Sequence, residues 1–343
     1  SKVERLLRLA YRVGKFADAE SKKAKEFTNT ELQAFARSVG SQSIVLAKND
    51  NSTLPIDSPV SIAVVGAHAR FGRGQGGGSA TVYPTEFVAP LEGLTKNVPA
   101  GSSVEYALGV NADSGLIQFD KNYLKNPATG QGGCLAEIFS PDGTLLLSED
   151  RFGGFFNWAT QPWMFKYSYI RVSGIFTANA DGEYQFGVGM VGNYKVTIGD
   201  QVHEGFIPMH SDDLGEFVLN PPFRAFGHTL KRGEEVLIQW EYPQGSLPIP
   251  IASFYIGFQE PSHSQAEEIA DAAELAAKSD VAVVFVGTTA EIESEGHDRS
   301  NISLPDGQDQ LVAAIAKVAK RTIVVVNSGS PVEMPWFEDV DSV

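Results

Sequence analysis

The stretch Val281-Ala282-Val283-Val284-Phe285-Val286 is an unbroken apolar run, and after a short connection the chain continues as Glu291-Ile292-Glu293-Ser294-Glu295-Gly296-His297-Asp298-Arg299. Short runs of β-branched and aromatic residues are typical of strands buried on both faces, as the strands of parallel sheets are. Open parallel sheets hold their ligands at the carboxyl ends of the strands. The acidic run is therefore a candidate catalytic loop. The alternative is a solvated turn, which is the usual role of charge runs in loops.

Helices and strands of the same α/β type are predicted on both sides of this strand. An alanine-rich helix is expected over residues 265–278, a second helix over 307–319 and a strand over 322–326. Nearer the N-terminus, the pattern predicts a helix over residues 30–46 and another buried strand over 61–66. Strands that alternate with helices in this way form a parallel sheet.

Between about residues 110 and 258 the pattern changes to alternating polar and apolar residues broken by glycines. This alternation predicts the strands of an all-β sandwich. Because α/β segments lie on both sides, we expect the sandwich to be inserted into one parent domain, which the chain leaves near Asn97 and re-enters near Ser262. The predicted fold class is an α/β parallel-sheet domain (an α/β sandwich) interrupted by an inserted all-β sandwich. Strands are expected over residues 167–172, 183–188, 194–198, 236–242 and 252–256.

Composition narrows the classes of partner. A formal net charge of -15 over 343 residues argues against nucleic acid, because nucleic-acid binders need a basic surface. No apolar run approaches the length of about 20 residues that a membrane-spanning helix needs. The single cysteine, Cys134, cannot form an internal disulfide, which favours the cytoplasm, although secretion stays open. Oligomeric state is open too, and a homo-oligomer is compatible with the sequence.

The segment Gly72-Arg73-Gly74-Gln75-Gly76-Gly77-Gly78 contains the spacing G-x-G-x-x-G of dinucleotide-binding loops. That fingerprint needs its first glycine at the end of a strand and a helix after its last glycine. Here the strand ends at Gly66, and the following Ser79-Ala80-Thr81-Val82-Tyr83-Pro84 is β-prone and closed by proline. We therefore interpret the segment as a loop whose backbone can approach a ligand closely, with a plain surface loop as the alternative.

The carboxylates of the acidic run are not equivalent. Glu291 and Glu293 alternate with Ile292, which is the pattern of a solvent-facing edge. Glu295 precedes Gly296, where the backbone can turn sharply, so its side chain is the one expected to project from the tip of the loop. A general acid needs a raised pKa and therefore an enclosed setting, which a loop gains when another domain closes over it.

The end of the run is expected to hold the loop in place. Asp298 and Arg299 are predicted to form a local ion pair or a loop anchor, and His297 is open to a structural or a catalytic role. The sequence contains no cluster of cysteine and histidine with metal-ligand spacing, no P-loop and no G-x-S-x-G nucleophile elbow. Neither a metal nor a cofactor is expected.

An ordered set of short motifs resembles glycoside hydrolase family 3, the β-glucosidase family. The inserted block resembles the protective-antigen-type β-sandwich of some members, on Tyr169-Ile170-Arg171-Val172-Ser173-Gly174-Ile175-Phe176 and Asp181-Gly182-Glu183-Tyr184-Gln185-Phe186. Each motif alone is weak, whereas the ordered set is specific. The other motifs are Arg5-Leu6-Leu7-Arg8-Leu9 with Gly14-Lys15-Phe16, Ser43-Ile44-Val45-Leu46-Ala47-Lys48-Asn49 with Leu54-Pro55-Ile56, Gly76-Gly77-Gly78-Ser79-Ala80, Glu293-Ser294-Glu295-Gly296-His297-Asp298-Arg299, Leu304-Pro305 with Gln308 or Gln310, and Val325-Val326-Asn327-Ser328-Gly329.

The resemblance implies a retaining glycosidase with two carboxylates, which stand about 5 Å apart in such enzymes. It implies that Glu295 protonates the leaving glycosidic oxygen and then activates water. The nucleophile, an aspartate, would lie in an N-terminal barrel that this sequence lacks, so the implied partners are that barrel and a small carbohydrate substrate. Implied substrate contacts are Gly77, Gly78 and Ser79 in the glycine loop and, in an irregular loop of the sandwich on the aglycone side, Phe206, Met209 and His210.

The implied domain order starts in mid-protein. Residues 1–27 are expected to be a linker and helix that follow the missing barrel, and residues 28–100 the first part of the α/β domain. Residues 101–261 would be the inserted sandwich and 262–343 the truncated second part of the α/β domain. Such a fragment is expected to be inactive by itself. The alternatives are a non-catalytic carbohydrate-binding or scaffold fragment, and a β-xylosidase or hexosaminidase of the same family.

Overall fold

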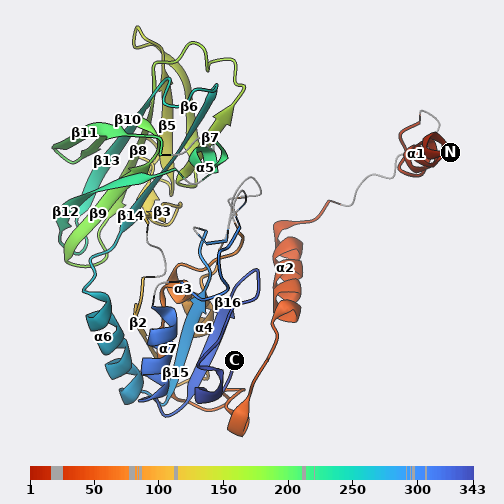
Figure 1. The fold of residues 1–343 in the computed structure, drawn as a ribbon, viewed down its shortest axis with the longest axis vertical. Coiled ribbons are helices and arrows are strands. Elements are labelled where there is room, and N and C mark those ends of the chain that lie inside the picture. The colour runs from red at the N-terminus through yellow and green to blue at the C-terminus, as the bar shows by residue number, and fades with distance from the viewer. Residues whose placement is uncertain are drawn as a thin grey trace. The chain divides into compact units, whose positions relative to one another are not determined.

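A computed structural model of the chain forms two compact units, Ser1–Ala47 and Lys48–Val343, which are described separately (Figure 1). The structure describes every residue except 17–25, 77–81, 83, 85–86, 112–114, 211–213, 220, 291, 294, 296–297 and 306. Among the described residues, no helix is long and apolar enough to span a bilayer.

The first unit contains the helices α1 (Lys2–Arg12) and α2 (Asn29–Ser43). Each begins with a capping box, in which a hydroxyl and a glutamate three residues later satisfy free backbone amides: Ser1 with Glu4, and Thr28 with Glu31. The helix expected over residues 30–46 ends earlier, at Ser43, because the backbone is extended at Ile44.

The second unit is built on a parallel sheet of β1 (Ser61–Val65), β2 (Ser103–Ala107), β15 (Val281–Gly287) and β16 (Thr322–Asn327). The strand order is β16-β15-β1-β2, and all described pairs are parallel. From β1 the chain steps to β2 on one side, then crosses to β15 on the other. The order of the strands therefore reverses between β1 and β15. The helices of this part are α3 (Ala67–Arg70), α4 (Pro90–Asn97), α6 (Gln265–Lys278) and α7 (Gln308–Ala316), with short 3-10 turns at Asp50–Ser52 and Phe337–Asp339.

Both faces of the parallel sheet are covered, which explains the apolar run of β15. Every residue of β15 is buried. One face packs against small and branched residues of α6 and α7, among them Ala276 and Ile315. The other face packs against α4 through Leu91 and Leu94. The sequence-based fold class is confirmed here: a strand without a polar face must lie between two layers of helices.

The strands between β2 and α6 belong to two antiparallel sheets. In the described residues, one sheet has the order β11-β10-β13-β8-β5-β6, with β4 on β8, and the other has the order β12-β9-β14-β3, with β7 on β14. The inserted all-β sandwich is thereby confirmed. Its strands are β3 (Ile117–Gln118), β4 (Leu124–Lys125), β5 (Cys134–Phe139), β6 (Leu145–Arg151), β7 (Phe155–Ala159), β8 (Tyr169–Thr177), β9 (Gly182–Gly189), β10 (Gly192–Ile198), β11 (Gln201–Ile207), β12 (Phe223–Leu230), β13 (Glu235–Pro243) and β14 (Ile251–Gln259).

Aromatic side chains fill the space between these two sheets. Phe119 stacks on Phe258 with ring centroids 4.8 Å apart, and Trp240 meets Phe119 edge-on at 5.7 Å. The indole nitrogen of Trp240 donates a hydrogen bond of 3.1 Å to the carbonyl of Gly187, so its polar atom is satisfied inside the core. A short helix, α5 (Leu214–Leu219), buries Phe217 beside Val191.

A substitution at Gly189 in β9 can test how tightly this core is packed. A Cβ atom at Gly189 would lie 1.9 Å from Cε1 of the Tyr255 ring, and that ring is buried. We expect Gly189→Ala to lower the free energy of unfolding by about 1–3 kcal/mol, because the ring must move within a packed interior. The control is Gly93→Ala in α4, where the nearest atom would be 3.7 Å away; alanine there should stabilise. Urea unfolding of both variants tests this, and equal stability would contradict the described packing.

Candidate active site at the carboxyl edge of the parallel sheet

The loops that follow β1, β15 and β16 meet at one edge of the parallel sheet. Nε2 of His68 in α3 lies 3.0 Å from the carbonyl oxygen of Thr288, and both residues are buried. At the end of β16, Asn327 Nδ2 donates a hydrogen bond of 3.0 Å to the carbonyl of Arg73, in the loop after β1. Because the strand order reverses between β1 and β15, this edge is where open α/β sheets bind ligands.

The end of β15 is held by a side-chain amide. Gln308, at the start of α7, accepts a hydrogen bond of 2.8 Å from the Gly287 amide and donates one of 2.9 Å to the Gly287 carbonyl. It also donates to the carbonyl of Pro305 at 3.0 Å. The Gln308 side chain is buried, and all these bonds are made inside the protein. The acidic loop therefore starts from a fixed point.

Glu293 holds the acidic loop against the loop after β16. Its carboxylate accepts hydrogen bonds from Ser330 Oγ at 2.6 Å, from the Gly329 amide at 3.0 Å and from the Thr288 hydroxyl. The expectation of a solvent-facing edge is wrong for Glu293, which is partly buried, because its partners come from a segment distant in the sequence. Glu291 lies outside the described residues.

Partial burial raises the pKa of Glu293, but the hydrogen bonds from Ser330, Thr288 and the Gly329 amide, with the charge of Arg299, outweigh it, so the net pKa is below the usual value. Glu293 is thus held in its ionised form, as an acceptor of hydrogen bonds.

Arg299 is bound at the other end of the acidic loop. Its Nη1 donates 2.7 Å to Ser330 Oγ and 3.2 Å to the carbonyl of Pro331, and its Nη2 donates 3.4 Å to the carbonyl of Ser303. Ser330 consequently touches both Glu293 and Arg299, so one serine joins the two ends of the loop. Asp298 is exposed. The anchoring roles of Asp298 and Arg299 stay predictions.

Glu295 lies between the hydrogen-bonded residues Glu293 and Arg299, and its side chain is exposed. Its position therefore suits a group that reaches a ligand outside the sheet edge. Several predicted site residues lie outside the described residues: Gly77, Gly78 and Ser79 in the glycine loop, and His297 in the acidic loop. No group of three or more histidine, cysteine, aspartate or glutamate residues suited to a metal occurs among those that are described.

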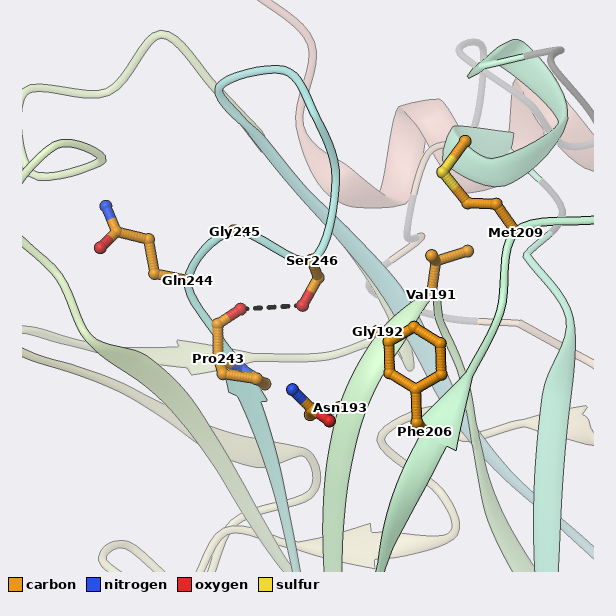
Figure 2. A pocket seen from close by; sticks show the side chains of 9 residues that line it. All are labelled: Val191, Gly192, Asn193, Phe206, Met209, Pro243, Gln244, Gly245 and Ser246. Atoms are coloured by element: carbon orange, nitrogen blue, oxygen red, sulfur yellow. Dashed lines mark hydrogen bonds between the residues drawn. The ribbon is translucent and has the colours of Figure 1, made fainter.

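A second candidate site is a pocket of about 350 Å³ in the sandwich. Phe206 and Met209 line it, with 60% and 37% of their surfaces exposed (Figure 2). The expectation that Phe206 lies in an irregular loop is wrong: it belongs to β11 and pairs with Asn193 of β10. His210 does not line the pocket; its ring meets that of Phe217 edge-on at 5.1 Å.

The pocket combines an aromatic ring with polar groups from the start of a strand and from a turn. Asn193 comes from the start of β10, and Gln244 and Ser246 from the turn after β13 (Figure 2). Ser246 Oγ donates to the carbonyl of Pro243 at 2.9 Å, which fixes that turn. An aromatic ring with amides and a hydroxyl among the lining residues suits a sugar, which has apolar and hydroxyl-bearing surfaces. Sequence analysis missed the turn residues, although Pro243-Gln244-Gly245 is a turn signal after a strand.

Comparison with known proteins places the chain among glycosidases. Residues 44–343 match the family model described as glycosyl hydrolase family 3 C-terminal domain. A probable β-glucosidase I of Emericella nidulans is 29% identical over 98% of this chain and 41% of its own length. The solved structure of a β-glucosidase from Kluyveromyces marxianus in complex with glucose has a TM-score of 0.81 and 26% identity, over 99% of this chain and 41% of that one.

A β-glucosidase from Streptomyces venezuelae, solved in complex with D-glucose, matches with a TM-score of 0.53 and 28% identity, over 99% of this chain and 38% of that one. The chain thus spans about two fifths of the length of these relatives. The matched segment includes the parallel sheet, the acidic loop and the inserted sandwich. The chain therefore belongs to glycoside hydrolase family 3, of which it contains the C-terminal domain.

Proposed function

We propose that this chain is the acid/base-bearing part of a retaining, exo-acting β-glucosidase that removes terminal β-D-glucosyl residues from small oligosaccharides or glucosides. Membership of the family and the similarity to β-glucosidases support the reaction class. The observation that carries the proposal is the place of Glu295: exposed, at the carboxyl edge of the sheet, and between the fixed residues Glu293 and Arg299.

Glu295 would act twice in the reaction. It first gives its proton to the glycosidic oxygen as the bond to the anomeric carbon breaks and an aspartate nucleophile forms the glycosyl-enzyme. It then takes a proton from the water that attacks this intermediate, which returns the glutamate to its acid form. The aspartate would come from a (β/α)₈ barrel, an architecture that is absent from the described residues.

Glu293 is unsuited to the acid role. Three hydrogen bonds and a nearby guanidinium stabilise its charged form, whereas a general acid must carry a proton when the substrate binds. We propose a division of labour in which Glu293 and Arg299 hold the loop and Glu295 transfers the proton. The pocket with Phe206 and Met209 would contact the leaving group of the substrate; the glycine loop, with Gly77, Gly78 and Ser79, would contact the sugar.

Exchange of each glutamate for glutamine separates the two roles. In the enzyme that contains both this chain and a barrel, Glu295→Gln should lower hydrolysis of an alkyl glucoside about 10²–10⁴-fold. An activated aryl glucoside needs no proton on its leaving group, so the first step should be spared. Glu293→Gln is the contrast: it should lower the melting temperature and affect both substrates alike, because the loop loses charged hydrogen bonds. Unchanged hydrolysis of the alkyl glucoside by Glu295→Gln would contradict the proposal.

The pocket gives a second prediction. Phe206→Ala should raise KM for a glucotriose about 2- to 10-fold, since an aromatic contact contributes roughly 0.5–1.5 kcal/mol. Val202→Ala is a matched control, because Val202 lies on the same strand, is 54% exposed and does not line the pocket. Steady-state kinetics of both variants test this, and an equal KM in the two would remove Phe206 from the binding surface.

The pocket also favours a second candidate, a carbohydrate-binding or scaffold protein without catalysis. A pocket of this chemistry can bind a sugar whether or not Glu295 transfers a proton. An assay of this chain on an aryl glucoside, with and without a barrel of the same family, distinguishes the glycosidase from the binding protein. Hydrolysis that appears when the barrel is added, and is lost when the barrel's nucleophile is removed, supports the glycosidase. Comparison of aryl glucosides, xylosides and N-acetylhexosaminides in the same assay identifies the sugar.

A further inference from the structure

An ion pair joins the parallel-sheet part to the inserted sandwich. Arg70, the last residue of α3, donates two parallel hydrogen bonds to Glu260, which directly follows β14: 2.6 Å from Nη1 and 2.8 Å from Nη2. The side chains are only 31% and 18% exposed. Asn179, in the turn between β8 and β9, donates a further bond of 2.6 Å to the same carboxylate. Bidentate arginine–carboxylate pairs of this kind fix the orientation of the two side chains as well as the distance between them.

Aromatic contacts connect Arg70 to the core of the sandwich. The Arg70 guanidinium lies 5.2 Å from the centre of the Phe71 ring, and Phe71 meets Tyr123 of the sandwich at 6.1 Å. Tyr123 in turn packs on Phe258 of β14, with ring centroids 5.0 Å apart. We call Arg70, Phe71, Tyr123, Asn179 and Glu260 the junction cluster.

The helix α3 also contacts the acidic loop. Its His68 lies 3.0 Å from the carbonyl of Thr288, and the hydroxyl of Thr288 donates to Glu293. Arg70 is two residues further along the same four-residue helix. One short segment therefore binds the base of the acidic loop with His68 and the inserted sandwich with Arg70.

The pocket lies at the other end of the sandwich from the junction cluster. It is lined by the start of β10 and by residues at or after the ends of β11 and β13, whereas Glu260 follows the last residue of β14. The β14 strand begins at Ile251, close in sequence to the pocket turn at Ser246. Its nine residues span about 30 Å, so a rotation of about 10° at the junction would move the pocket by about 5 Å.

We propose that Arg70 is a positioning residue: through Glu260 it sets the angle of the inserted sandwich, and hence the place of the pocket relative to the acidic loop. The expected effect of Arg70 on substrate binding rests on the proposed function. The expected effect of Arg70 on the angle of the sandwich does not. Arg70 touches no reacting atom. Arg70 affects the binding of a substrate long enough to reach from Glu295 to the pocket. It does not affect the binding of a small substrate.

The chain offers a matched control in Arg171 of β8. It pairs with Glu241 of β13 at 3.1 Å, with side-chain exposures of 29% and 23%, and its guanidinium lies 5.4 Å from the centre of the Tyr169 ring. Arg171 therefore resembles Arg70 in charge, burial and aromatic contact. Both of its partners, however, lie within the sandwich. Its loss should affect stability to a similar extent without changing the angle of the insert.

The angle can be measured by distance between two spin labels in the 343-residue chain. Suitable sites are Lys166, exposed near the pocket end of the sandwich, and Lys317, exposed after α7, each changed to cysteine. The native Cys134 is buried, and burial raises the pKa of its thiol to about 12, so it stays unlabelled in the folded chain. We expect one narrow distance distribution in the parent, and a broad or shifted one in Arg70→Met and in Glu260→Gln. In Arg171→Met it should be unchanged.

Kinetics provide the second measurement, in the enzyme that contains this chain and a barrel. Arg70→Met should raise KM for a glucotriose roughly 3- to 30-fold and leave kcat and KM for p-nitrophenyl β-glucoside within about twofold. Arg171→Met should change neither. An unaltered distance distribution in both junction variants, or an equal change in Arg171→Met, would overturn the proposal. If the parent enzyme hydrolyses neither glucoside, the proposed function fails, while the distances still decide whether Arg70 positions the sandwich.

Discussion

The pairing of β1 with β15 is the constraint on which the rest of the structure depends. The sandwich is inserted between β2 and α6, so these two strands meet across more than 200 residues of chain, in the register Ile62 to Val281. At their amino ends the Asp280 carboxylate accepts hydrogen bonds from the amide and hydroxyl of Ser61, at 3.0 and 2.8 Å. These bonds and Lys320 hold the pKa of Asp280 well below its usual value. A slip in this register would move the carboxyl ends of the strands, and the acidic loop with them.

The properties that could be predicted from the sequence are those that follow from local pattern. The uniform apolar run of β15 indicates a strand between two layers of helices. The alternation after residue 110 indicates a sandwich of two sheets, each with one buried face. Contacts between distant segments leave no such pattern. The pattern around Glu293 is that of a solvated carboxylate because its partner Ser330 is 37 positions away. Arg70 and Glu260 are 190 positions apart, so no local pattern indicates their pairing. The sequence alone predicts a loop at Phe206, because the pairing of β11 with β10 depends on partners that periodicity does not identify.

Two neighbouring carboxylates of the acidic loop have different surroundings. Glu293 and Glu295 are two positions apart, yet one is enclosed by donors and the other is exposed. Donors stabilise a negative charge and so suit an anchor; an exposed carboxylate takes its properties from whatever closes over it. Under the proposed function, the sheet edge would set the position of Glu295, and the surface that covers it would determine its reactivity.

The Gln308 amide has a consequence for how the end of β15 depends on the loop that follows it. Strand β15 extends past the last residue of β1, so Gly287 has no partner in β1. The Gln308 side chain supplies the donor and the acceptor that β1 would otherwise provide. Among the described residues, Gly287 at the end of β15 is therefore hydrogen-bonded through Gln308 rather than through the acidic loop. A substitution in that loop would leave both hydrogen bonds between Gln308 and Gly287 in place. One buried glutamine thus makes the end of a central strand independent of the side chains in the loop that it carries.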